Sequence, residues 1–280
     1  MSANSLPKLE FFPILMVKSY SAKNNPLHKR AIAKLFAKIK QLKCHIHIIM
    51  VNYNKLLNLP SSDELLDSDD KPVDHEIQIL IPNLLWLILN QLWGDRSDWF
   101  FGINMGIFHT TGSNPRVAIV PDAFLSLGVP KLKDDKLRSS YILWEENYIV
   151  PSFVLEIVSK TYGDEYDEKM TDYARLGVLY YVIYNPDYFK RDKHESFEVY
   201  RLLNGAYQRL QGNPVWMPEI ALGIGTEVNN YYRYQRELLY WYDSEGNRFM
   251  TPEEEALQQR QRAEQLERML RSLGVDPEKL

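Results

Sequence analysis

The stretch from Glu156 to Pro186 reads EIVSKTYGDEYDEKMTDYARLGVLYYVIYNP and determines the expected fold. The apolar run Ile149–Leu155 leads into it, which predicts a strand that ends at Val158. A polar loop follows, and acidic residues early in the next segment favour a helix from about Glu165 to Leu176. A second strand is predicted from Val178 to Tyr184, before an Asn-Pro pair. Strand–helix–strand units build parallel or mixed sheets, so we expect an α/β protein.

Two carboxylates stand in or beside strand-like apolar runs. Asp122 follows the run Val117–Val120 and Pro121, and Glu156 follows the second run. A buried carboxylate is costly unless it is paired or binds a cation. Two carboxylates on neighbouring strands can share one hard divalent ion, which is how metal-dependent nucleases hydrolyse phosphodiesters. The alternative is structural: each carboxylate caps a helix or pairs with a nearby Lys or Arg.

The order of these motifs resembles a known family. The chain resembles the Uma-type restriction endonuclease family of the PD-(D/E)xK nuclease superfamily. The resemblance rests on Pro121-Asp122, on the run Val154–Ser159, and on an ordered series of an acidic residue, Lys, Tyr-Ala, Gly-Val, Tyr-Tyr and Pro that ends at Pro186. The resemblance covers about 74–243. It implies a restriction-endonuclease-like core, with a mixed central β-sheet flanked by helices and a C-terminal helical tail. It also implies a Mg²⁺- or Mn²⁺-dependent endonuclease with DNA as its substrate.

The resemblance also assigns site residues. Asp122 and Glu156 match the metal-binding carboxylates, and the backbone carbonyl of Ile157 would join them. The superfamily usually has a lysine two residues after the glutamate, where this chain has Val158. In the resembled family a lysine on the following helix, here Lys169, supplies that charge, orients or deprotonates the attacking water and stabilises the phosphate.

Three further residues are candidates with less support. Lys160 competes with Lys169 because it is nearer to Glu156 in sequence. Glu76 begins a predicted helix, Glu76–Trp93, from which an acid approaches the metal in related nucleases; an exposed helix start is the favoured alternative. His109 follows a predicted strand over Trp99–Phe108, and a structural histidine is favoured there.

Composition divides the chain into four expected parts. Residues 1–49 carry nine Lys/Arg and one acidic residue, and we interpret them as a basic, disordered N-terminal extension, with an arm that binds nucleic acid or a membrane surface as the alternative. A linker at 50–74 precedes a nuclease-like domain at 75–243 and a helical tail at 244–280. The remainder of the chain after residue 49 has a net charge of −12, which argues for a local basic groove at most, since DNA binding depends on neutralising phosphates.

The cysteine count and the lengths of the apolar runs limit the cellular compartment and the kinds of partner that we expect for this protein. The single Cys44 excludes an internal disulfide and a cysteine-based zinc site, so a reducing, cytoplasmic compartment is expected. No apolar run reaches the ~18–20 residues needed to span a membrane. A homodimer is compatible with the sequence. The alternative to an endonuclease is a catalytically inactive nuclease-like module that binds nucleic acid or forms oligomers.

The C-terminal third adds three expectations. Asn204-Gly205 between alternating runs predicts a hairpin over about 195–210 that extends the sheet. The aromatic segment Asn229–Tyr242 is assigned to core or dimer packing in preference to base stacking. Thr251-Pro252 begins a predicted helix that runs to Leu273 and carries a loose apolar stripe.

Overall fold

A computed structural model describes residues 59–61, 64–65, 76–112, 114–133, 135–160, 164–231, 234–274 and 276, without the side chains of 230, 231 and 234. The predicted basic extension (1–49) and most of the predicted linker (50–74) lie outside these residues. From Pro60 onward the chain forms one unit. Within the described part, no helix is long and apolar enough to cross a membrane.

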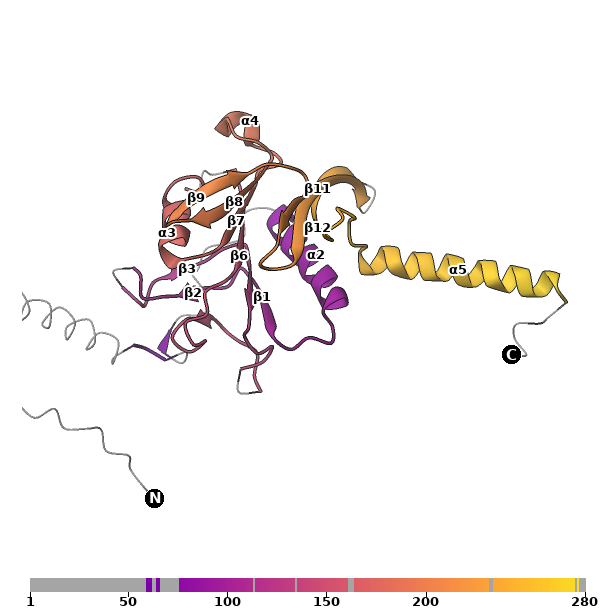
Figure 1. The fold of residues 1–280 in the computed structure, drawn as a ribbon, viewed down its shortest axis with the longest axis horizontal. Helices are drawn as coiled ribbons and strands as arrows, with labels where there is room; N and C mark the ends of the chain where they lie inside the picture. Colours follow the sequence, from indigo (N-terminus) through magenta and orange to yellow (C-terminus); the bar gives the residue numbers. More distant parts are fainter. Residues whose placement is uncertain are drawn as a thin grey trace, which may run out of the picture. The chain divides into compact units, whose positions relative to one another are not determined.

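A mixed sheet forms the centre of this unit (Figure 1). Its six strands run in the order β1-β4-β6-β7-β8-β9. Among the described strand pairs of this sheet, only β6 and β7 are parallel, and helix α3 (Glu168–Leu176) connects them. The predicted mixed α/β architecture is therefore confirmed. The strands are β1 (Trp99–Ile103), β4 (Ala123–Leu127), β6 (Phe153–Ile157), β7 (Tyr180–Tyr184), β8 (Phe197–Leu203) and β9 (Ala206–Leu210).

Two three-stranded sheets accompany the central one. One has the order β3-β2-β5 and the other β10-β11-β12. The first consists of β3 (Ala118–Ile119), β2 (Ile107–Phe108) and β5 (Tyr141–Ile142); the second consists of β10 (Val215–Met217), β11 (Leu222–Tyr231) and β12 (Tyr234–Tyr242).

Two strand predictions were wrong in detail. The expected single strand over Trp99–Phe108 is two strands in different sheets, because the chain turns at Asn104, which has a φ of 45°. The expected strand before Asp122 is only β3, and it belongs to a small sheet. Asp122 therefore precedes the central strand β4 and does not end a central strand.

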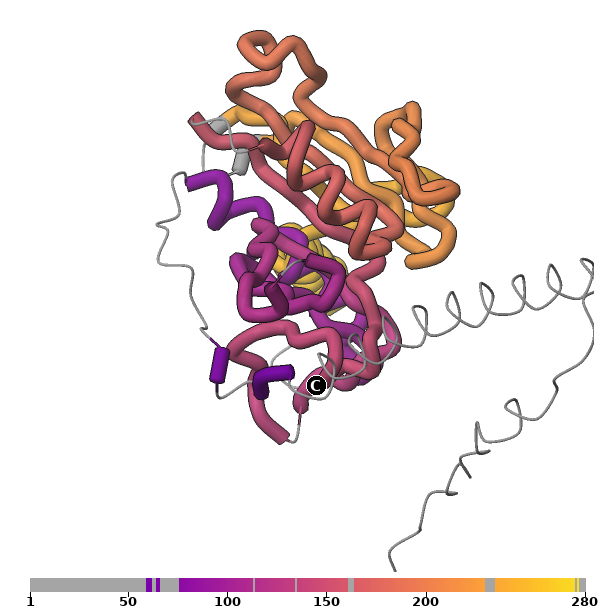
Figure 2. Tube along the Cα trace, turned by 90° about the vertical axis from the view of Figure 1, so that its left-hand side faces the viewer, coloured from indigo at the N-terminus to yellow at the C-terminus, as the bar shows by residue number. Residues whose placement is uncertain are grey.

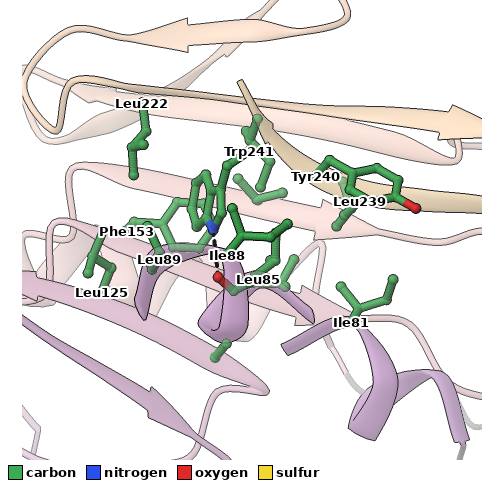
Figure 3. Packing of buried hydrophobic residues seen from close by; sticks show 14 of the residues in the cluster. Ile81, Leu85, Ile88, Leu89, Leu125, Phe153, Leu222, Leu239, Tyr240 and Trp241 are labelled. Atoms are coloured by element: carbon green, nitrogen blue, oxygen red, sulfur yellow. Dashed lines mark hydrogen bonds between the residues drawn. The ribbon is translucent and has the colours of Figure 1, made fainter. Parts of the chain in front are cut away.

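One face of the central sheet is apolar. Helix α2 (Glu76–Leu92) and the sheet β10–β12 cover it, and Phe153, Leu155 and Ile157 of β6 point into this core. Figure 3 shows Trp241 of β12 packed between α2 and the sheet, with its indole Nε1 donating to the Leu85 carbonyl at 3.0 Å. This contact confirms core packing for the described part of the aromatic C-terminal segment.

The opposite face carries α3 and a group of tyrosines. Figure 1 shows the central sheet between α3 and α2; in Figure 2, α3 lies in front of the strands and the yellow α5 behind them. Val154, Tyr173, Tyr181 and Ile183 pack together here. Glu156 has the same strand parity as Val154 and so points to this face.

The remaining elements largely match their predictions. The β8–β9 hairpin extends the sheet edge and turns at Asn204-Gly205, with φ angles of 52° and 81°. Such angles suit a type I′ turn. A short helix, α4 (Phe189–Asp192), follows β7, and α5 (Pro252–Ser272) forms the tail. Thr251 caps α5, accepting from the Glu254 amide while the Glu254 side chain accepts from the Thr251 amide.

Candidate active site

The register of β4 against β6 brings the two predicted carboxylates together. Ala123 lies opposite Leu155 in this antiparallel pair, so the next positions outward, Asp122 and Glu156, are opposite each other. Two residues far apart in sequence thus meet at one edge of the central sheet. They also share the face of the sheet that α3 covers.

The Asp122 carboxylate is buried and strongly perturbed. Its side chain accepts from the Ile157 amide at 2.6 Å and from Gln78 Nε2 at 3.2 Å. Burial raises the pKa of Asp122 to about 8, and the neighbouring Glu156 carboxylate adds to this effect. Without a bound cation, the Asp122 side chain is therefore largely protonated near neutral pH. A bound cation would favour its charged form.

The Glu156 carboxylate, which is 1% exposed, has a defined partner on each oxygen. Oε2 accepts from Lys169 Nζ at 2.8 Å, and Oε1 accepts from the Tyr173 hydroxyl at 2.6 Å. Burial raises the pKa of Glu156, although the Lys169 ammonium and the Tyr173 hydroxyl oppose this. Burial also raises the pKa of Tyr173, so the hydroxyl remains a proton donor.

Lys169 reaches the site from the first turn of α3. The helix begins at Glu168, three residues later than predicted, because Asp164 has a φ of 62° and the chain turns before the helix. Burial alone would lower the pKa of Lys169, but the Glu156 carboxylate outweighs it and raises that pKa. The structure therefore joins Lys169 to Glu156 by an ion pair. Tyr173, one turn further along α3, bonds directly to Glu156.

Gln78 is a site residue that sequence reasoning missed. Its Nε2 lies 3.2 Å from Asp122 Oδ1 and 3.4 Å from the Ile157 carbonyl oxygen, so it bridges two predicted metal ligands. Its Oε1 is buried and has no hydrogen-bond partner among the described residues. The sequence did contain a signal for this role, because Gln78 is a polar residue on the same face of the helix as the buried Pro82 and Leu85.

The other candidates lie differently. Glu76 is exposed at the start of α2. Lys160 is exposed, and its backbone carbonyl accepts from Arg191. His109 is buried and bonds through Nδ1 to Thr111 Oγ1 at 2.8 Å, which fits the structural role favoured from the sequence. Val158, at the superfamily's lysine position, is 2% exposed within the apolar cluster that contains Tyr173.

The donor set fits a hard divalent ion. Asp122, Glu156, the Ile157 carbonyl and the unpartnered Gln78 Oε1 are all oxygen donors, the kind that Mg²⁺ and Mn²⁺ prefer. Within the described ranges, no group of three or more His, Cys, Asp or Glu side chains could hold a metal. A metal here would consequently depend on two carboxylates plus amide or main-chain oxygens.

Comparison with known proteins identifies the family. Residues 70–229 match the Uma2 family, described as "Putative restriction endonuclease". The chain belongs to the Uma2 family. It is also similar in structure to "a putative nuclease belonging to DUF820" from Anabaena variabilis, with a TM-score of 0.38 and 13% identity, over 53% of this chain and 74% of that one. A search of the curated proteins gives no match.

Proposed function

We propose that this Uma2 protein is a metal-dependent endonuclease that hydrolyses phosphodiester bonds in DNA. The observation that supports this most is the meeting of Asp122, Glu156 and Lys169 at one edge of the sheet, with Lys169 Nζ 2.8 Å from Glu156. Two buried acidic residues with raised pKa values beside one lysine lower stability through desolvation if they have only a structural role. Such groups are common where catalysis needs them.

The carboxylates and the main chain would hold the ion. Asp122, Glu156 and the Ile157 carbonyl are the proposed ligands for Mg²⁺ or Mn²⁺. When bound, the ion would polarise the phosphoryl oxygen and lower the pKa of a bound water. Each carboxylate oxygen has a second lone pair, so Glu156 can keep its bonds to Lys169 and Tyr173 while it contributes a ligand.

Lys169 is the proposed catalytic cation. Its ammonium is fixed by Glu156 and remains charged because that carboxylate raises its pKa. From this place it would orient the attacking water and stabilise negative charge that develops on the phosphate. Its side chain retains 32% exposure, so a substrate can approach it. Tyr173 acts as a positioning residue through its bond to Glu156.

Gln78 is proposed to adjust to the ion. In this structure its amide nitrogen donates toward Asp122 and Ile157. A half-turn of the amide about its last torsion would exchange nitrogen and oxygen and direct Oε1 toward the same two groups. The amide could thus replace a donor by an acceptor when a cation is present.

A second function is supported by Val158. A chain without the superfamily's usual lysine, and with a net charge of −12 after residue 49, could be an inactive module that only binds nucleic acid. The two proposals differ in one outcome, which is cleavage.

The decisive experiment is incubation of supercoiled plasmid with the full chain, with Mg²⁺, Mn²⁺ or EDTA. We expect nicked or linear DNA only with metal, none with Asp122→Ala, and a loss of about 100-fold or more with Lys169→Ala. Lys160→Ala is the matched control and should retain activity. In titration calorimetry, Lys169→Ala should still bind Mn²⁺, whereas Glu156→Ala should not.

Each contrary outcome has a defined meaning. If the wild type cuts neither DNA nor a matched RNA with either metal, the endonuclease proposal fails and the binding module is favoured. Full activity in Lys169→Ala with loss in Lys160→Ala would transfer the role to Lys160.

The domain boundaries are also proposals. We place the nuclease-like domain at 75–243 and the helical tail at 244–280. A chain without residues 1–49 should keep both its melting temperature and its cleavage activity. A marked drop in melting temperature would show that the basic extension packs on the rest of the protein.

A further inference from the structure

Helix α5 carries an apolar stripe that the described structure leaves uncovered. None of its side chains is buried. Leu266 and Leu273 are 53% and 77% exposed, although burial of a leucine side chain is favourable. The stripe has alternating spacings of three and four residues, which is the heptad pattern of paired helices. Its members are the apolar Ala256, Ala263, Leu266, Leu270 and Leu273 and the polar Gln259, whereas the exposed Leu257 and Met269 lie outside it.

A groove continues this stripe onto the body of the protein. It lies between α2 and the first turns of α5, has a volume of about 520 Å³ and is mainly apolar. Its lining includes Leu87, Asn90 and Gln91 of α2, and Glu255, Ala256 and Gln259 of α5. The first two stripe residues thus form part of the groove, whereas the later ones extend beyond it. Figure 1 shows α5 projecting away from the sheets.

The sizes of the stripe residues favour an antiparallel partner with the same sequence. Small or polar residues occupy the first half of the stripe, and leucines occupy the second half. When two copies run in opposite directions about a centre between 264 and 265, Ala256 faces Leu273, Gln259 faces Leu270 and Ala263 faces Leu266. Each large residue then meets a smaller one, which permits close packing. A parallel pair would stack leucine on leucine and leave alanine opposite alanine.

The charges on α5 favour the same arrangement. Its first turn contains Glu253, Glu254 and Glu255, and its last turn contains Arg271. Two antiparallel copies place the acidic start of one helix beside the basic end of the other. Their helix dipoles then point in opposite directions, which is also favourable. Beside the stripe, Arg260 of one copy would face Glu267 of the other, a pairing that occurs twice by symmetry.

We propose that the protein forms a homodimer in which α5 pairs antiparallel with α5 of a second copy. In this dimer, Leu270 and Leu273 of one copy enter the groove between α2 and α5 of the other. The stripe spans 18 residues, or about 27 Å of helix, so the contact covers five turns. This inference is independent of the proposed nuclease activity.

Sedimentation velocity on the full chain tests the interface. The wild type should sediment with the mass of two chains, and Leu266→Glu with the mass of one. Leu257→Glu is the matched control: Leu257 is similarly exposed, at 56%, but lies on the opposite side of α5 from the stripe. It should remain a dimer. Both variants change exposed positions, so circular dichroism should show unchanged helix content.

Cysteine cross-linking tests the orientation. In a Cys44→Ser background, chains with Gln259→Cys and chains with Leu270→Cys should form a disulfide only when the two are mixed. In the antiparallel pair, two copies of the same cysteine lie 11 residues apart along the helices, or about 16 Å, which is too far for a disulfide. If each chain cross-links with itself, the helices are parallel and the proposed arrangement is wrong. A wild type that stays monomeric at its highest soluble concentration, or a Leu266→Glu variant that remains dimeric, overturns the α5 interface and leaves the groove to another occupant.

Discussion

The two faces of the central sheet are built by the same strands, yet they differ in chemistry. Toward α2, β6 presents Phe153, Leu155 and Ile157, which lie in an apolar core. Toward α3, the same strand presents Glu156, bonded to Lys169 and Tyr173. Alternation along one strand separates these environments by a single residue.

This difference assigns separate tasks to the two faces. The α2 face is closed by apolar packing, which stabilises the fold through the burial of apolar surface. The α3 face holds buried carboxylates whose raised pKa values show that their ionisation is disfavoured in the folded state. Residues that stabilise the fold can therefore be distinguished from site residues by how their substitution changes stability and activity, and by whether that change depends on pH and metal.

The largest effect is expected on the apolar face. Phe153 is fully buried, with its ring centroid 5.1 Å from that of Trp241. Phe153→Ala should lower the free energy of unfolding by about 3–5 kcal/mol, because it removes a large side chain and leaves a cavity. Urea denaturation measures this. The exposed Leu257→Ala should change stability by about 0.5 kcal/mol or less, and a similarly small loss for Phe153→Ala would contradict the comparison.

A smaller, pH-dependent effect is expected at Asp122. The pKa of Asp122 is raised to about 8 from an ordinary value of 3.8. The stability associated with its neutral form is thus complete below about pH 4 and is lost as the pH rises toward 8. Asp122→Asn removes this titration, and Gln78 can turn its free Oε1 to accept from the new amide. Without metal, the variant should exceed the wild type in melting temperature by a margin that grows from pH 4 to pH 8.

Thermal unfolding in EDTA measures that margin, and Mn²⁺ supplies a contrast. At pH 8, Mn²⁺ should stabilise the wild type more than the asparagine variant, since the ion requires the charged carboxylate. A margin independent of pH would show that Asp122 is already ionised in the folded protein.

The Lys169–Glu156 pair should show a moderate effect. Lys169→Ala leaves a buried carboxylate without its cation, and because the lysine is 32% exposed we expect a loss of only about 1–2 kcal/mol. Adding Glu156→Gln to Lys169→Ala should recover most of this loss. If the two substitutions were additive in urea denaturation, the pair would contribute no coupling energy.

The smallest effect is expected at Tyr173. Tyr173→Phe keeps the ring in its cluster and removes only the hydroxyl that donates to Glu156 at 2.6 Å. The loss of this bond should lower stability by about 0.5–1.5 kcal/mol. It should also raise the pKa of Glu156 further, so cleavage by the variant should need a higher pH than cleavage by the wild type. An unchanged pH profile would limit Tyr173 to packing.

Local sequence patterns determined the elements. The series from Glu156 to Pro186 predicted the β6–α3–β7 unit, and Asn204-Gly205 predicted the hairpin. Helix α2 and the tail helix were also predicted nearly to their ends. Each of these signals depends on residues within one or two turns of each other, where backbone preference and periodicity act directly.

Only the tertiary structure decided how the site is assembled. Asp122 and Glu156 were named from sequence, but their meeting depends on the register of β4 against β6. Gln78 lies 44 residues from Asp122, and the rotation of α2 about its axis brings it, in place of Glu76, to the carboxylates. The sequence also predicted one strand where the turn at Asn104 separates β1 from β2. Register, helix rotation and sheet assignment arise from contacts between distant segments, which residues near each other in sequence do not specify.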